Sequence, residues 1–249
     1  MLGGWELFSR LGVVNPVLIS RPSGILVALY HLLGAKSASG HSVLLTHTFI
    51  SLYRLALAFI MAATAGVGIG ILMGVNKYIY RFLDPIITVI MPIPGIAWAP
   101  IFMLWLGFGD PTIVTVGALA AFFPIVYNTA TGVRSVEEKL VWSAQSMGAD
   151  RKTIFMRVYL PGAAAHIFTG LKLGFARGWR TIIAVEMIAA SLWGLGFMIF
   201  DAREYLRPSI IYGGIFVLAV TYLLIENVLI KRIENRTVGR WGMVRAEVI

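Results

Sequence analysis

The chain has 249 residues, of which 58% are hydrophobic and 13% are charged. An average soluble domain carries about 25% charged residues, so this composition excludes an ordinary soluble enzyme and a disordered chain. The absence of cysteine excludes disulfides, thiol nucleophiles and cysteine metal sites, and the four histidines show no ligand spacing, so we expect no metal and no catalytic residues. In a membrane protein, a net charge of +9 reflects the Lys and Arg that collect in cytoplasmic loops, so we do not take it as a sign of a nucleic-acid partner.

Long hydrophobic runs predict an all-α integral membrane protein, because the strands of a membrane β-barrel would alternate every second residue. Each run is long enough to cross a hydrocarbon core of about 30 Å. The fourth run is apolar in outline but contains Lys172, Arg177, Arg180 and Glu186. The five predicted spans are Leu55–Asn76, Pro85–Gly109, Pro111–Val133, about Ala163–Ala190, and Pro208–Ile230.

The distribution of Lys and Arg predicts the orientation. The loops at Lys77–Asp84 and Arg134–Leu160, together with the tail from Lys231, hold 12 of the 21 cations, and the opposite side holds six. Because cytoplasmic loops collect Lys and Arg, we expect the central loop and the C-terminus in the cytoplasm. The expected organisation is one transmembrane domain over 1–249: an extracytoplasmic segment (1–45), three spans (46–133), a cytoplasmic loop (134–161), two spans (162–230) and a basic cytoplasmic tail (231–249).

The N-terminal segment contains no obvious signal segment or full span. We therefore expect a sixth, N-terminal helix to be missing or truncated. A true five-span protein is the alternative.

Small residues repeat every fourth position in the first span, at Ala58, Ala62, Gly66, Gly70 and Gly74. Such spacing forms a flat helix face that another backbone can approach closely. The face predicts tight helix packing, either with a second copy or within one subunit.

The second span contains Met91-Pro92-Ile93-Pro94-Gly95, and each interior proline removes a helix hydrogen bond. We expect a bent or broken helix, which is tolerated at membrane depth where it lines a cavity. Ionisable residues inside a span need a partner or water, so Arg180 or Glu186 faces a polar cavity or forms a structural ion pair. The candidate translocation path comprises Met91, Pro92, Pro94, Trp98, Arg180 and Glu186.

The central loop is too long for a turn and too amphipathic for a linker. We predict a short helix from about Val136 to Met147, with Gly148 in the left-handed position after its end. Asp150 is expected to cap a second helix that runs to Leu160, where Pro161 and Gly162 interrupt it. Such a helix pair either docks a partner or packs on the protein's own spans.

The loop has a sequence pattern of its own. Ala144, Gly148 and Leu160-Pro161 occur at the spacing of Glu-Ala-Ala, three residues, Gly, nine residues, Ile, any residue, Leu-Pro. Val158 is a mild change, and Trp142-Ser143 replaces the first two letters. This pattern resembles the permease subunits of binding-protein-dependent type I ABC importers.

The nitrate/sulfonate/taurine branch is the nearest likeness. It is indicated by segments distributed over nearly the whole chain: Arg21-Pro22-Ser23, Asp84, Leu104–Gly107, Phe123-Pro124-Ile125, Val185-Glu186, Gly194-Leu195-Gly196 and Asp201–Glu204.

The resemblance implies a permease, most simply a homodimer, in the inner (plasma) membrane of a prokaryote. An extracytoplasmic solute-binding protein would deliver a small anionic solute such as a sulfonate, taurine or nitrate. An ABC ATPase dimer would bind ATP and Mg and power the path; this chain has no Gly-x-x-x-x-Gly-Lys-Ser/Thr loop and is expected not to be an enzyme. By matching positions, the residues assigned to ATPase coupling are Glu137, Glu138, Trp142, Ala144, Gly148, Ala149, Asp150, Leu160 and Pro161.

The alternative function is an ion-gradient-driven secondary transporter with Glu186 as proton carrier. That class usually carries internal repeats, which are not evident here. An intramembrane enzyme would need a cluster of catalytic or metal-binding side chains within the spans, and a channel would need a filter motif.

Overall fold

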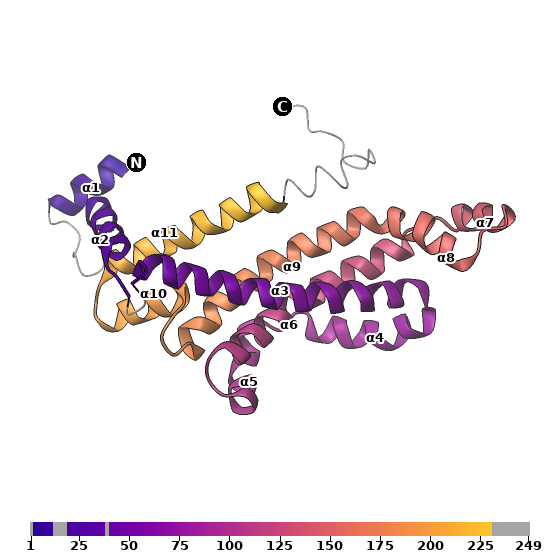
Figure 1. Cartoon of the computed structure of the whole chain (residues 1–249), viewed down its shortest axis with the longest axis horizontal. Helices are drawn as coiled ribbons and strands as arrows, with labels where there is room; N and C mark the ends of the chain where they lie inside the picture. Colours follow the sequence, from indigo (N-terminus) through magenta and orange to yellow (C-terminus); the bar gives the residue numbers. More distant parts are fainter. Residues whose placement is uncertain (1, 12–18, 38–39, 231–249) are drawn as a thin grey trace. The chain divides into compact units, whose positions relative to one another are not determined.

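The computed structural model describes residues 2–11, 19–37 and 40–230 (Figure 1). Apart from an isolated bridge between Lys36 and Ser42, these residues contain no β structure. The predicted basic tail, 231–249, lies outside the described residues. The helices in chain order are α1 (Leu2–Arg10), α2 (Pro22–Gly34), α3 (Val43–Val75), α4 (Lys77–Ile90), a 3-10 turn (Gly95–Trp98), α5 (Ala99–Leu106), α6 (Asp110–Arg134), α7 (Glu138–Ser146), α8 (Arg151–Ile154), a π-helical turn (Phe155–Tyr159), α9 (Leu160–Ala189), α10 (Leu195–Glu204), α11 (Pro208–Ile225) and a second π-helical turn (Glu226–Ile230).

Four helical stretches in the described chain are long and apolar enough to cross a membrane. They are α3, α6, the continuous helix Arg151–Ala189, and Pro208–Val228. The broken pair formed by α4 and Gly95–Leu106 makes a fifth if it is counted as one span. These stretches correspond to the five predicted spans. The apolar helix α2, which is too short for a span, was not predicted.

Helix α3 begins at Val43, well before the predicted start of the first span at Leu55. The helix extends past the uncharged run, which was taken to begin after Arg54. Arg54 instead lies inside the helix and is buried. At 1.5 Å per residue, the helix is about 50 Å long, so it extends beyond a hydrocarbon core of about 30 Å.

The proline-rich segment breaks the second span, as predicted. Helix α4 is capped at its start by the Asn76 side chain, which accepts hydrogen bonds from the amides of Tyr78 and Ile79. It ends at Ile90, and the chain resumes as the 3-10 turn from Gly95. Pro92 and Pro94 lack the N–H groups that would continue the helical ladder, which explains the interruption.

Pro161 does not interrupt the helix, contrary to the prediction. Residues Arg151–Ala189 form one continuous helix, in which a π-helical turn at Phe155–Tyr159 directly precedes Leu160 and Pro161. The amide of Leu160 donates to the carbonyl of Phe155, five residues earlier. This wider turn gives the proline ring room that an α-helical turn would deny it.

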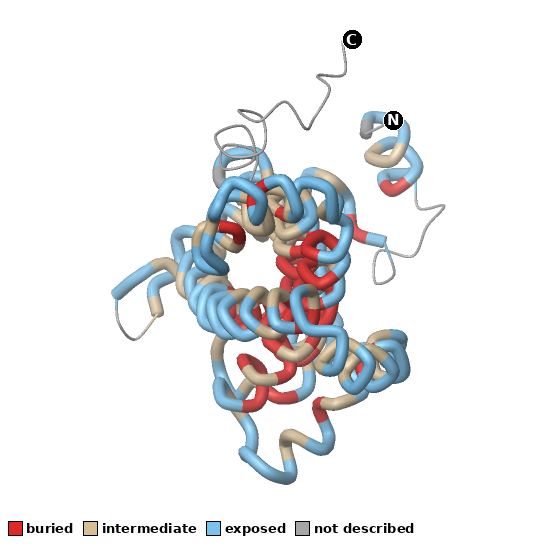
Figure 2. Tube along the Cα trace, turned by 90° about the vertical axis from the view of Figure 1, so that its right-hand side faces the viewer, coloured by how far each residue is buried: buried red, intermediate tan, exposed pale blue. Residues whose placement is uncertain are grey.

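The residues divide into two compact units, which are described separately. Unit 1 comprises 1–56, 98–116 and 179–225; unit 2 comprises 57–97, 117–178 and 226–249. Among the four helices long enough to span a membrane by themselves, α6 is the most buried. Buried residues are coloured red in Figure 2. In unit 2, an apolar core joins α3, α4 and α6 through Met73, Ile87, Phe123 and Val126.

The predicted small-residue face of α3 packs against α6 within unit 2. Gly66, Gly70 and Gly74 lie opposite a matching row at every fourth residue of α6, formed by Ile125, Thr129 and Val133. A Cβ on Gly70 would lie 2.5 Å from Thr129 Cβ and 2.8 Å from the Val126 carbonyl oxygen. The close approach of these two helices in one subunit therefore accounts for the spacing.

Candidate functional site

Three polar side chains form a stripe on the otherwise apolar helix α3. His47, Ser51 and Arg54 are separated by four and three residues, which places them on one helix face. All three are buried in unit 1. A buried polar stripe requires partners on other elements, and in this unit the partners come from α6, α9 and the turn before α10.

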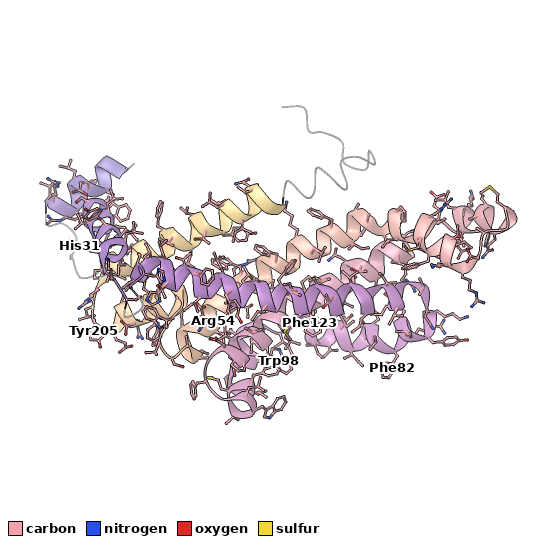
Figure 3. All side chains as sticks on the ribbon, viewed as in Figure 1. His31, Arg54, Phe82, Trp98, Phe123 and Tyr205 are labelled. Carbon is pink, nitrogen blue, oxygen red and sulfur yellow. The ribbon has the colours of Figure 1, made fainter. Side chains whose placement is uncertain are left out.

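Arg54, labelled in Figure 3, is the centre of this cluster. Its Nη1 donates to Glu186 Oε1 at 2.8 Å and to the Trp193 carbonyl at 2.7 Å. Its Nε and Nη2 donate to Asp110 Oδ1 at 2.8 and 2.7 Å. One guanidinium thus connects the start of α6, the end of α9 and the following turn to α3.

Glu186 has 0% exposed surface, and several donors satisfy its carboxylate. Besides Arg54, the Ser51 hydroxyl lies 2.9 and 2.8 Å from the two carboxylate oxygens, and the Gly196 amide donates to Oε2 at 2.9 Å. The Ser51 oxygen in turn accepts from the Leu195 amide at 2.8 Å. The first residues of α10 therefore close around the carboxylate.

Gly194 is required at the centre of this turn. Its φ of +138° lies in the region that favours glycine, and a Cβ there would lie 2.6 Å from Glu186 Cδ and 2.7 Å from Arg54 Nη1. The ring of His47 covers the same residue, with Nδ1 3.1 Å from the Gly194 nitrogen. We call the set His47, Ser51, Arg54, Asp110 and Glu186 the buried polar cluster.

Of the two interpretations kept open for Glu186, the structure favours the ion pair. The carboxylate, assigned by sequence to the translocation path, has no exposed surface and serves to hold α3 and the α9–α10 turn together in unit 1. Arg54, Ser51, His47 and Asp110 were missed by sequence reasoning. The polar stripe at helical spacing was the available signal.

The remaining candidate path residues lie at or near the proline break, except Arg180. Pro92 and Pro94 are exposed, and Met91 and Trp98 are partly exposed. In unit 2, Arg177 of α9 reaches the break, where its Nη1 lies 3.4 Å from the Met91 carbonyl oxygen. Arg180 is exposed on α9. The Lys172 Nζ lies 3.8 Å from Glu226 Oε1.

The central loop of unit 2 forms the predicted pair of short helices. Gly148 has φ +80°, its amide donates to the Gln145 carbonyl, and the Ala149 amide donates to the Ala144 carbonyl. This is the Schellman arrangement that ends a helix at a left-handed glycine. The predicted conformation of Gly148 is therefore confirmed.

Asp150 caps α8 as predicted. Its Oδ1 accepts from the Thr153 amide at 3.1 Å, and the hydrogen bonds from the Thr153 side chain and backbone lower the pKa of the Asp150 carboxyl below its ordinary value. At the other end of the loop, Glu137 precedes α7 without a side-chain cap, and Glu138 occupies its first turn, where a carboxylate favours the helix dipole.

The loop has apolar surface on its outside. Trp142 is 59% exposed and Met147 is 81% exposed, whereas Ala144 is buried. Leu160 and Pro161 lie where the loop passes into α9. Tryptophan and methionine are enriched at protein–protein interfaces, so their exposure on this loop is typical of a protein contact.

Known proteins identify the family. The family described as "Binding-protein-dependent transport system inner membrane component" matches residues 66–235. The chain belongs to this family. It is 35% identical over 226 residues to the taurine transport system permease protein TauC of Escherichia coli (strain K12), covering 91% of this chain and 82% of the relative. It is 32% identical over 240 residues to the nitrate import permease protein NrtB of Leptolyngbya laminosa, covering 96% and 84%.

A solved structure shows the same fold. An inward-facing structure of the MetNI methionine ABC transporter matches with a TM-score of 0.67 and 17% identity, over 84% of this chain and 100% of that chain. The all-helical importer-permease fold predicted from the sequence is confirmed. The permease is a membrane subunit of an ATP-driven, binding-protein-dependent importer.

Proposed function

We propose that the permease forms the path for a small anionic solute and is driven by an ABC ATPase dimer that docks on the α7–α8 loop. The observation that carries this proposal is the loop itself, in a chain of this family: a Schellman-terminated helix with exposed Trp142 and Met147 outside the spanning helices. The excess of cations on this side of the spans supports a cytoplasmic loop, where the ATPase would lie.

The coupling segment is Glu137–Asp150. Glu138 and Trp142 present polar and apolar groups on the exposed surface of α7, while Ala144 packs inward. Gly148 and Ala149 set the turn, and Asp150 begins the helix that continues through Leu160 and Pro161 into α9. Because α8 and α9 are one continuous helix, displacement of the loop by the ATPase is transmitted directly to a spanning helix. ATP and Mg belong to the ATPase, and this chain binds neither.

The path runs along the break at Met91–Pro94 and Trp98 and along the exposed side of α9 at Arg180. A second copy of the permease completes it, and an extracytoplasmic binding protein loads it. The protein lies in the inner membrane of a prokaryote with its C-terminus in the cytoplasm. ATP-driven closure of the ATPase dimer shifts the permease between outward-facing and inward-facing states.

The solute we propose is a sulfonate, taurine, nitrate or a similar small anion. The relatives with the names taurine and nitrate each match over 90% of this chain. Exposed arginines within the spanning helix α9 suit an anion, because a guanidinium binds sulfonate, nitrate or carboxylate oxygens in pairs.

Uptake in cells tests the proposal. Uptake of labelled taurine and labelled nitrate is compared between cells that lack the permease and cells in which it is restored. We expect uptake of at least one anion to depend on the permease, to stop when ATP is depleted, and to continue when an ionophore collapses the ion gradients. Uptake that survives ATP depletion and stops with the ionophore would establish the ion-gradient alternative instead. That alternative assigned proton transfer to Glu186, whose carboxylate is fully buried and held by Arg54 and Ser51.

A further inference from the structure

One face of α9 is exposed and polar along much of its length. His166, Thr169, Leu173, Arg177 and Arg180 are separated by three, four, four and three residues, and each is exposed. This spacing keeps them on one side of a helix. The adjacent side, with Gly170 and Gly174, packs on α6 within unit 2.

This face lies too deep in the helix to be explained by cations at the membrane surface. Arg177 lies about 18 Å along the axis before the helix ends at Ala189, at 1.5 Å per residue. A charged side chain facing lipid near mid-bilayer costs about 2.5–3.5 kcal/mol on insertion scales. Histidine, threonine and two arginines on one face therefore favour contact with water over contact with lipid.

Arg177 also lies at the break in the neighbouring span. Its Nη1 is 3.4 Å from the Met91 carbonyl, which is longer than the 2.7–3.2 Å typical of a strong N–H···O hydrogen bond. Among the described residues, the Met91 carbonyl is the hydrogen-bond acceptor of the Arg177 guanidinium. The contact holds the side chain at Met91, which directly precedes exposed Pro92, and it leaves most of the guanidinium's five N–H donors for a ligand.

We propose that the α9 face lines the aqueous path and that Arg177 is the residue that contacts the anion in transit. The inference rests on the proposed function and adds a solute-binding residue to it. The ligand class is a small oxyanion, sulfonate, nitrate or carboxylate, whose paired oxygens match the guanidinium fork. Replacement of the weak Met91 contact by the anion requires little rearrangement, which suits a site that must release its ligand.

The absence of cysteine allows a direct test. Leu173, 50% exposed and one turn before Arg177, is replaced by cysteine in the complex purified from its native membrane. The thiol is then reacted with two methanethiosulfonates, one carrying an anionic sulfonatoethyl group and the other a cationic trimethylammonioethyl group. The first reagent is itself a small sulfonate and probes the site without knowledge of the solute.

Each rate is divided by the rate of the same reagent with a free thiol in solution, because a thiolate reacts intrinsically faster with the cationic reagent. We expect L173C to react with both reagents, and the normalised rate to favour the sulfonate about tenfold, as a unit charge a few ångströms away in water would produce. Arg177→Gln should reduce this preference to near unity, and Arg177→Lys should retain most of it. Ile60→Cys, on an exposed apolar position of α3, is the matched control and should react with neither reagent.

Two results would overturn the inference. If L173C reacts with neither reagent, the face is not aqueous and packs on lipid or a second copy. If both reagents react at equal normalised rates that R177Q does not change, the path is aqueous but Arg177 is not its anion site. The first result would also remove α9 from the proposed path. Neither result affects the proposal of ATP-driven import, which is decided separately by ATP-dependent uptake.

Discussion

Replacement of Arg54 by methionine should strongly destabilise the permease. The change removes the guanidinium that donates to Glu186 and Trp193 and leaves the Glu186 carboxylate buried at 0% exposure without a cation. Removal of one partner of a buried ion pair costs about 3–5 kcal/mol, because the remaining charge is uncompensated. Little of this comes from Asp110, whose side chain is 56% exposed and remains hydrated without Arg54.

Glu186→Gln is the complementary change. It keeps the shape of the side chain and an acceptor for Ser51 or Gly196, so we expect a smaller cost of about 1–3 kcal/mol. In the double variant no charge is left unpaired between positions 54 and 186. The double variant should therefore be destabilised by at least about 1 kcal/mol less than the sum of the two single-variant effects.

The assay is equilibrium unfolding of the purified protein in mixed detergent micelles, for the wild type, both single variants and the double variant. Arg203→Met is the matched control in the same unit, because the Arg203–Glu204 pair is exposed and its loss should cost about 0–1 kcal/mol. If R54M costs no more than R203M, or if the effects of R54M and E186Q simply add, then Arg54 and Glu186 do not form a stabilising buried ion pair.

Three further predictions concern helix packing and the loop. Gly70→Ala should destabilise by about 1–3 kcal/mol through its clash with Thr129, whereas Gly68→Ala, with nothing within 4 Å, should be neutral or stabilising; equal effects in unfolding assays would contradict the packing. Gly148→Val should abolish coupled uptake in a folded protein, because φ +80° strains a β-branched residue, and Gly148→Asn should retain it; normal ATPase-coupled uptake by the valine variant would show the docking assignment to be wrong. The pKa of Asp150 is lowered in the folded protein, so the capping contribution of its carboxylate is present above the ordinary pKa and is lost only as the pH falls through the lower folded value. Asp150→Asn should therefore leave the shape of the uptake profile between pH 5.5 and 8 unchanged. A difference in titration between wild type and variant in that range would disprove the ionised cap.

Local chemistry made much of the fold predictable. Lipid-exposed helices must be apolar along their whole length, so uncharged runs located the spans. The positions of Gly148 and Asp150 followed from backbone preferences that act within a few residues. The break at Met91–Pro94 followed equally from the missing amides of proline.

The predictions that failed depended on partners distant in the chain or on backbone adjustment. Arg54 was taken as a boundary because a charge is tolerated within a spanning helix only when a partner lies beside it. That partner, Glu186, is 132 residues away, and the sequence contains no sign of the pairing beyond the spacing of His47, Ser51 and Arg54. Pro161 was expected to end a helix, but a π-helical turn absorbs its ring.

Co-purification from the native membrane tests the central claim most directly. The tagged permease is solubilised in mild detergent, and the proteins that accompany it are identified and quantified by mass spectrometry. We expect an ATPase subunit with a nucleotide-binding loop in near-equal amount, and its loss when Trp142 is replaced by aspartate while the permease remains folded. A folded permease that purifies without any ATPase, from membranes in which uptake persists after ATP depletion, would show that it is not the subunit of an ATP-driven importer.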